Sequence, residues 1–135
     1  MSYPIIQIEG IGEVYAEKLI AAGIKTTKDL LDKCACPKGR EAVENETGIA
    51  HGLILKWANH ADLMRIKGIG GQFAELLEAA GVDTVKELRN RKPANLQAKI
   101  AEVNEAKHLC KRTPALKEVE KMVAAAAELD PVMTY

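Results

Sequence analysis

The chain has 135 residues, 47% of them hydrophobic but only 4% aromatic, so we expect one compact domain with a core of Ala, Leu, Ile and Val. Nineteen Lys and Arg balance nineteen Asp and Glu, which excludes nucleic-acid binding through bulk charge and leaves only a local basic patch. Neither a signal peptide nor an apolar run near twenty residues is found, so we expect a cytoplasmic protein without a membrane segment.

The first predicted feature along the chain is a glycine hairpin at Gly10-Ile11-Gly12, followed by an apolar helix. That helix is expected to end at Ala22-Gly23, because glycine after the last apolar residue is typical of a helix C-terminus. Thr26 or Thr27 then caps a second helix over residues 28–33. Composition rich in Ala, Leu, Glu and Lys favours helices over strands throughout.

Two further helices complete the first half of the chain. One covers residues 40–46 and stops at Thr47-Gly48, and the next covers residues 50–61. In the second of these helices, apolar residues recur every four positions and form one face. Trp57 lies on this face, and we expect it to anchor the interface between the two halves.

The second half begins with a copy of the first. Residues 66–89 repeat residues 8–31 at an offset of 58, with 13 of 24 positions identical and no gap, so the chain is an internal duplication. The copy has its hairpin at Gly68-Ile69-Gly70 and its helix end at Ala80-Gly81. Thr84 follows as the N-cap of the next helix, with Glu87 completing a capping box.

Two more helices and a tail follow. Pro93 can occupy the first turn of one helix, whose apolar face runs to Cys110, and Thr113-Pro114 opens the last. Residues 130–135 are expected to form a loose tail, although the last four residues are compatible with either disorder or a contact segment. The predicted fold is all-α with about eight helices, in two repeated units (residues 1–61 and 62–130) packed as one compact domain, and a tail at residues 131–135.

The hairpins resemble a known motif. An apolar residue, Gly-Ile-Gly and a small residue four positions later are similar to the helix-hairpin-helix motif, here with Ile8 and Ala16 around the first glycines and Ile66 and Ala74 around the second. Two in tandem resemble the paired arrangement of many DNA repair and recombination proteins. Nearly all of residues 3–130 resembles a bacterial family of unknown function with helix-hairpin-helix character, through segments such as Asp62-Leu63-Met64-Arg65. The resemblance implies a tandem helix-hairpin-helix fold and no settled activity.

A glycine turn before a helix leaves backbone N–H groups free to bind an anion such as a nucleic-acid phosphate, without reading sequence. Glu9, Glu13 and Glu17 surround the first hairpin and would repel a phosphate, so we expect that hairpin to be structural. We expect the second hairpin to bind, and reversing Lys67 to glutamate to abolish binding with helical content intact. The predicted nucleic-acid-binding residues are Arg65, Lys67, Gly68, Gly70, Gly71, Gln72, Arg89, Arg91 and Lys92. A further basic stretch, Lys107, Lys111 and Arg112, is a candidate extension of the same track.

Other functions remain open at this point. The glycines can serve only to pack helices closely, and the fold is also used for protein–protein contacts, so the alternative function is an interaction or assembly module that has lost phosphate binding. No nucleotide-binding fingerprint, nucleophile–base pair or acidic cluster is found, so we expect no enzymatic activity, no metal and no cofactor. Cys34, Cys36, His108 and Cys110 form a metal site only if the fold brings them together.

Overall fold

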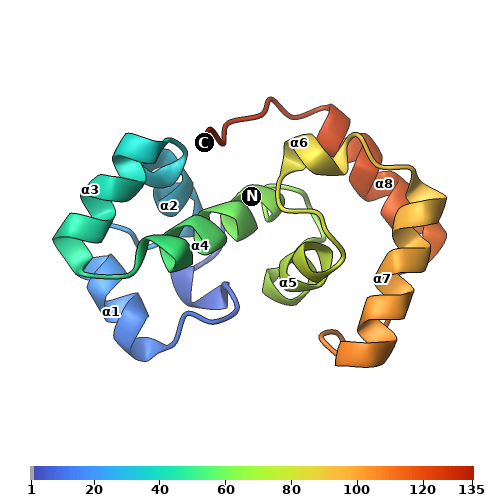
Figure 1. The fold of residues 1–135 in the computed structure, drawn as a ribbon, viewed down its shortest axis with the longest axis horizontal. Helices are drawn as coiled ribbons and strands as arrows, with labels where there is room; N and C mark the ends of the chain where they lie inside the picture. Colours follow the sequence, from blue (N-terminus) through green and yellow to red (C-terminus); the bar gives the residue numbers. More distant parts are fainter. Residues whose placement is uncertain (1) are drawn as a thin grey trace.

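The computed structural model describes residues 2–135 and is all-helical. Within these residues the only β-structure is an isolated bridge between Pro4 and Thr26. A short 3-10 helix, η1 (Ile5–Gln7), precedes eight α-helices (Figure 1). They are α1 (Glu13–Ala21), α2 (Thr27–Cys34), α3 (Pro37–Thr47), α4 (His51–Leu63), α5 (Gly71–Ala79), α6 (Val85–Leu88), α7 (Pro93–Lys107) and α8 (Leu116–Ala127). No helix in this range is both long and apolar enough to cross a membrane.

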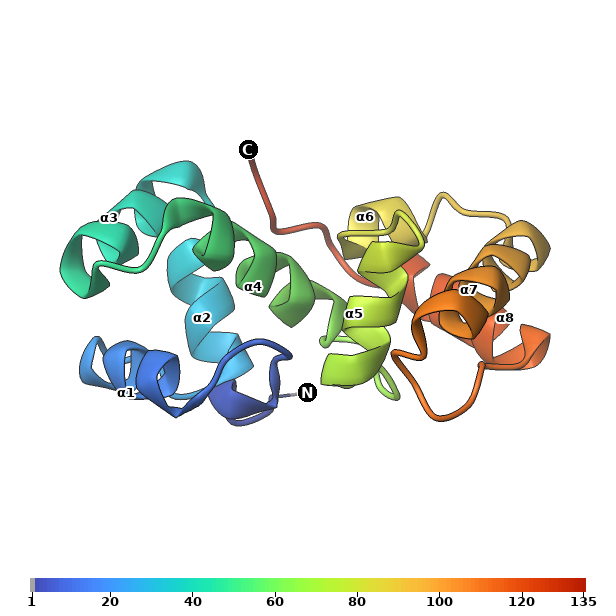
Figure 2. The same ribbon diagram turned by 60° about the horizontal axis from the view of Figure 1, so that its bottom comes forward.

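The helices form two lobes joined by α4. Helices α1 to α3 surround the first part of α4, and α5 to α8 gather at its other end (Figures 1 and 2). One continuous cluster of buried apolar side chains runs through both lobes. The predicted boundary between residues 61 and 62 falls inside the last turn of α4, so this helix belongs to both repeated units.

The two hairpins have the same backbone geometry, as expected of a duplication. Gly10 and Gly68 adopt φ of +91° and +95°, a region that only glycine enters without strain. Gly12 and Gly70 are both extended N-caps, of α1 and α5. Thr84 caps α6 with its side chain, as Thr26 caps α2. The predicted capping box at Thr84 is not complete, because Glu87 accepts from the N–H of Asp83 instead, whereas the box at Thr26 is complete.

Several predicted boundaries were wrong by a few residues. Helix α3 begins at Pro37 rather than at residue 40, because proline is well suited to the first turn. Helix α7 ends at Lys107, since His108 adopts a left-handed conformation at its C-cap, and Cys110 therefore lies in the following loop. Helix α8 begins at Leu116 rather than at residues 113–114, with Ala115 as its N-cap.

Trp57 is buried in the apolar core, and its ring packs against residues of the first unit. It lies edge-on against Tyr15, with 5.1 Å between ring centroids. Its indole Nε1 is also the nearest atom to the position a Cβ on Gly10 would occupy. The predicted role of Trp57 as an anchor between the two halves stays a prediction.

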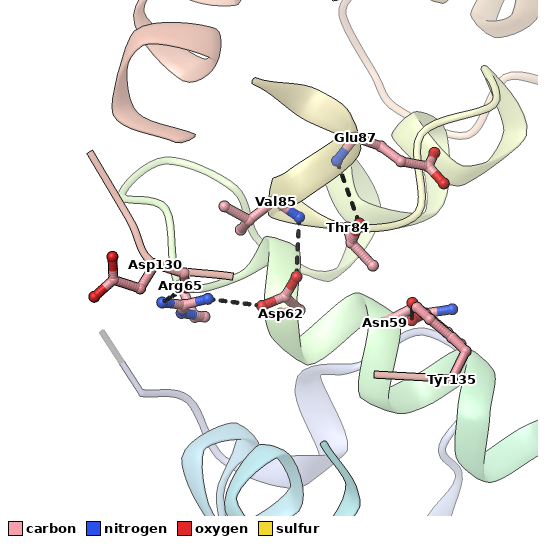
Figure 3. A network of polar contacts seen from close by, with 8 residues as sticks. All are labelled: Asn59, Asp62, Arg65, Thr84, Val85, Glu87, Asp130 and Tyr135. Atoms are coloured by element: carbon pink, nitrogen blue, oxygen red, sulfur yellow. Dashed lines mark hydrogen bonds and ion pairs between the residues drawn. The ribbon is translucent and has the colours of Figure 1, made fainter. Parts of the chain in front are cut away.

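Polar contacts of α4 add to the apolar core in joining the two units. His60 is fully buried, and its Nε2 lies 3.0 Å from Oε2 of Glu78 on α5. Asp62 accepts hydrogen bonds from the backbone N–H of Val85 on α6 and from Nη1 of Arg65, both at 2.9 Å (Figure 3). The C-terminal part of α4 is thereby joined to α5 and α6, the first two helices after it.

The last residues are not a loose tail. They run as an extended strap from α8 back to the first unit (Figures 1 and 2). Thr134 donates its N–H to the carbonyl of Ala35 at 2.8 Å, Met133 is buried, and the Tyr135 hydroxyl donates to Asn59 Oδ1 at 2.7 Å. Arg40 is only 2% exposed, and its Nη2 donates to the carbonyl of Thr134 at 2.7 Å. The contact-segment alternative is therefore the one that the structure supports.

Removing the strap is expected to destabilise the fold. A chain truncated after residue 130 loses the carbonyl that Arg40 uses, and a hydrogen bond to a buried cation contributes about 2 kcal/mol. Urea unfolding should measure this loss. The Tyr135→Phe variant is the control, because it removes one part-buried hydroxyl contact and keeps the carbonyl that Arg40 uses, so it should unfold closer to the native midpoint than the truncated chain. Equal stability of the truncated and full chains would show that the strap is not docked in solution.

Candidate nucleic-acid interface

The second hairpin is held by two buried isoleucines and leaves a helix end uncapped. Ile66 and Ile69 are buried, and the N–H of Ile69 donates to the carbonyl of Ile66 at 3.1 Å. Gly70 is the N-cap of α5 and has no side chain with which to cap it. The first N–H groups of α5 therefore have no partner within the helix, and the positive end of the helix dipole adds to them.

A hollow of about 360 Å³ lies beside this helix end. It is lined on one side by the start of α5 and on the other by the loop that joins α7 to α8. Its lining residues are Gly70, Gly71, Gln72, Phe73, Cys110, Lys111 and Arg112. The hollow therefore joins the hairpin to the second of the two basic stretches that the sequence suggested, at residues 107–112.

A neighbouring hollow of about 360 Å³ shares Phe73 and Arg112 with the first. Lys67 and Gly68 of the hairpin line it together with Lys121 of α8. Neither Phe73 nor Lys121 is among the nucleic-acid-binding residues predicted from the sequence. The spacing of Lys117 and Lys121 on one helix was the only sequence signal for the latter, and it does not distinguish a site from an ordinary solvated face.

The cations around these hollows differ in how firmly they are held. Arg112 forms a two-pronged contact with Glu118, at 2.7 and 2.8 Å, and this contact lowers the pKa of the Glu118 carboxyl to about 2. Lys67, Lys111 and Lys121 are exposed and form no ion pair with any other residue of the described range. These three lysines are therefore the cations free to meet an anion.

Acidic groups also lie near the first hollow. Burial raises the pKa of the Cys110 thiol, and the carboxylates of Glu75 and Glu9 raise it further. An anion beside Lys111 would therefore also feel these two carboxylates. This mixture of charges favours weak binding over tight binding.

Four predicted basic residues do not line either hollow. Arg65 is committed elsewhere, because its guanidinium donates to Asp62 Oδ1 and to the carbonyl of Asp130, both at 2.9 Å (Figure 3). Arg89, Arg91 and Lys92 follow α6, which comes after the opposite end of α5. Arg91 instead donates to the carbonyl of Gly81 at 2.7 Å.

Gly71 was predicted to bind phosphate, and the structure also gives it a packing role. It is buried, and a Cβ at this position would lie 2.0 Å from the carbonyl oxygen of Gln7 in the first unit. The duplicated position in the first unit is Glu13, which is exposed. Glycine is therefore required at position 71 by the close approach of the two units, whatever binds nearby. Lys67, Gly68, Gly70, Gly71 and Gln72 are the predicted residues that line the hollows.

The histidines and cysteines do not assemble into a chemical site. Within residues 2–135, no three His, Cys, Asp or Glu side chains form a group able to hold a metal ion, so Cys34, Cys36, His108 and Cys110 do not come together. His60 is fully buried, and this burial lowers its pKa in spite of the opposing effect of Glu78.

A protein-family model described as Domain of unknown function (DUF4332) matches residues 9–129. No curated protein and no solved structure matches the chain significantly. The match covers both hairpins, all eight α-helices and the loop that carries Lys111 and Arg112.

Proposed function

We propose that this chain, which belongs to the family Domain of unknown function (DUF4332), is a non-enzymatic binding module for the sugar–phosphate backbone of nucleic acid. In this proposal the two glycine hairpins are helix-hairpin-helix motifs, and only the second binds. Binding is weak and independent of base sequence, as expected when backbone amides and lysines contact phosphates.

The observation that carries the proposal is the hollow at the start of α5. The uncapped first turn of α5, whose first N–H groups have no partner within the helix, lines the same hollow as Lys111 and Arg112. Lys67 and Lys121 line the adjoining hollow, so that the cations extend along one surface. This local patch is the feature that a chain of zero net charge requires in order to bind a polyanion.

The first hairpin has the same backbone but a different charge. Glu13 occupies the first turn of α1, where a carboxylate is stabilised by the helix dipole. Its carboxylate already supplies the negative charge that a bound phosphate would bring to this helix end. Gly10 is packed against Trp57. These features support a structural role for the first hairpin.

Fluorescence anisotropy of labelled DNA and RNA at two salt concentrations tests the proposal. The affinity should fall steeply as salt rises, because counterions are released from the phosphates. Lys67→Glu and Lys111→Glu should each reduce the affinity about tenfold for every sequence and lower the salt slope by about 1. Lys38→Glu, an exposed lysine on α3 of the first unit, is the matched control and should leave binding nearly unchanged.

A protein-interaction module is the second candidate, and the exposed Val14 (66%) and Ile20 (46%) on α1 of the first unit favour it. An apolar interface responds little to salt, whereas a phosphate site responds strongly. Absence of nucleic-acid binding at low salt would reject the phosphate site and favour this alternative.

A further inference from the structure

The duplication allows one aromatic position to be compared in two surroundings. Phe73 on α5 corresponds to Tyr15 on α1, at the same offset of 58 residues. The ring of Tyr15 is covered by Trp57, edge-on at 5.1 Å between centroids. The counterpart of α4 in the second unit is α8, which follows α7 as α4 follows α3, and α8 contains no aromatic residue. The second unit therefore has no aromatic ring at the position that covers Tyr15 in the first.

Phe73 borders open space instead. It is only partly buried, and it is one of the two residues that line both hollows of about 360 Å³. This size lies at the lower end of the range of small-ligand pockets, about 300–1,000 Å³. Free lysines lie on both sides of the ring, with Lys111 in one hollow and Lys67 and Lys121 in the other.

We propose that Phe73 is a stacking platform for an unpaired nucleobase, so that the ligand of the second hairpin is single-stranded nucleic acid. An aromatic face beside a row of cations is the arrangement used for binding single strands without sequence preference. One base lies against Phe73, and the phosphates on its two sides meet Lys111 and Lys67. A duplex cannot make this contact, because its base faces are already stacked within the helix.

This inference rests on the proposed function, but it predicts a preference that phosphate contacts alone do not. Backbone contacts treat single and double strands alike apart from charge density, whereas stacking favours the single strand. The purine or pyrimidine identity of the base is expected to matter little, because every base offers a flat face.

The test compares a labelled oligothymidine with a duplex of equal length, for the native chain and for two Phe73 variants. Phe73→Leu should reduce the affinity for the single strand about tenfold, the effect of losing one stacked base, and leave duplex binding unchanged. Phe73→Trp should retain single-strand binding, because it keeps an aromatic face at this position. Its added indole should lose fluorescence when oligothymidine binds, whereas the fully buried Trp57 of the native chain should not. Circular dichroism of each variant confirms that the helical content is retained.

The outcomes separate the two proposals. Single-strand binding that is salt-sensitive and lost in Lys111→Glu, yet unchanged in Phe73→Leu, overturns the stacking inference and leaves the phosphate site standing. A tenfold loss in Phe73→Leu for both the single strand and the duplex also overturns it, because the effect is then structural. No binding of either form at low salt overturns both proposals.

Discussion

Replacing Gly71 by alanine is expected to destabilise the chain by about 3 kcal/mol, because the added methyl group would collide with the backbone of Gln7. The new Cβ would lie 2.0 Å from the Gln7 carbonyl oxygen and 3.2 Å from its carbon, and neither can move without displacing the segment between η1 and α1. Alanine is otherwise the better helix former, so propensity alone predicts a gain of up to about 1 kcal/mol. A measured loss of stability would therefore show that the contact with Gln7 outweighs helix propensity, and a gain would show the reverse.

Urea unfolding followed by circular dichroism measures this effect. Gly52→Ala is the matched control, because Gly52 also lies in the first turn of a helix but has nothing within 4 Å of the added Cβ. We expect this control to be neutral or slightly stabilising. If Gly71→Ala were as stable as Gly52→Ala, the two units would not approach each other as closely as the structure indicates.

Gly71 also illustrates the limit of sequence reasoning for this chain. The duplication, the glycine turns and the threonine caps are local signals, and they predicted the all-α fold with eight α-helices in the described residues. The role of Gly71 depends on Gln7, which is 64 residues away in the sequence. The sequence does not distinguish a glycine required for close packing against another backbone from a glycine required for the approach of a phosphate.

The basic residues show the same limit for the candidate site. Arg89, Arg91 and Lys92 form the denser charge run, but they follow α6, after the far end of α5. Lys111 and Arg112 lie about 40 residues beyond the hairpin in sequence and yet border the same hollow, because the loop after α7 returns to the start of α5. Charge density along the sequence was therefore a poor guide to charge density around the site. The strap was missed for a related reason, because its partner Arg40 lies 94 residues away from Thr134.

Asp62 joins the last turn of α4 to the start of α6. It is 1% exposed, and its two carboxylate oxygens accept from Val85 N–H and from Arg65 Nη1 (Figure 3). Val85 is the first residue of α6, a helix of only four residues that has little stability of its own. The carboxylate therefore satisfies a buried N–H group and places a negative charge at the positive end of that helix.

Asp62→Ala should consequently lower the free energy of unfolding by about 3 kcal/mol, because it leaves a buried N–H group and a partly buried guanidinium without their acceptor. Asp62→Asn should lose less, since its carbonyl oxygen can still accept from Val85 while its amide opposes Arg65. Asp32→Ala is the control, because Asp32 forms only an exposed pair with Lys28 and its loss should scarcely move the unfolding midpoint.

Two probes reveal where the Asp62→Ala chain fails. Trp57 fluorescence reports on the first unit, in whose core the indole lies, whereas circular dichroism reports on all helices. The native chain should give coincident transitions, because one apolar core runs through both units. In Asp62→Ala we expect part of the helical signal to be lost at lower urea than the Trp57 signal, because α6 and its neighbours separate from α4 first. Coincident transitions with an unchanged midpoint would mean that the apolar core alone holds the units together.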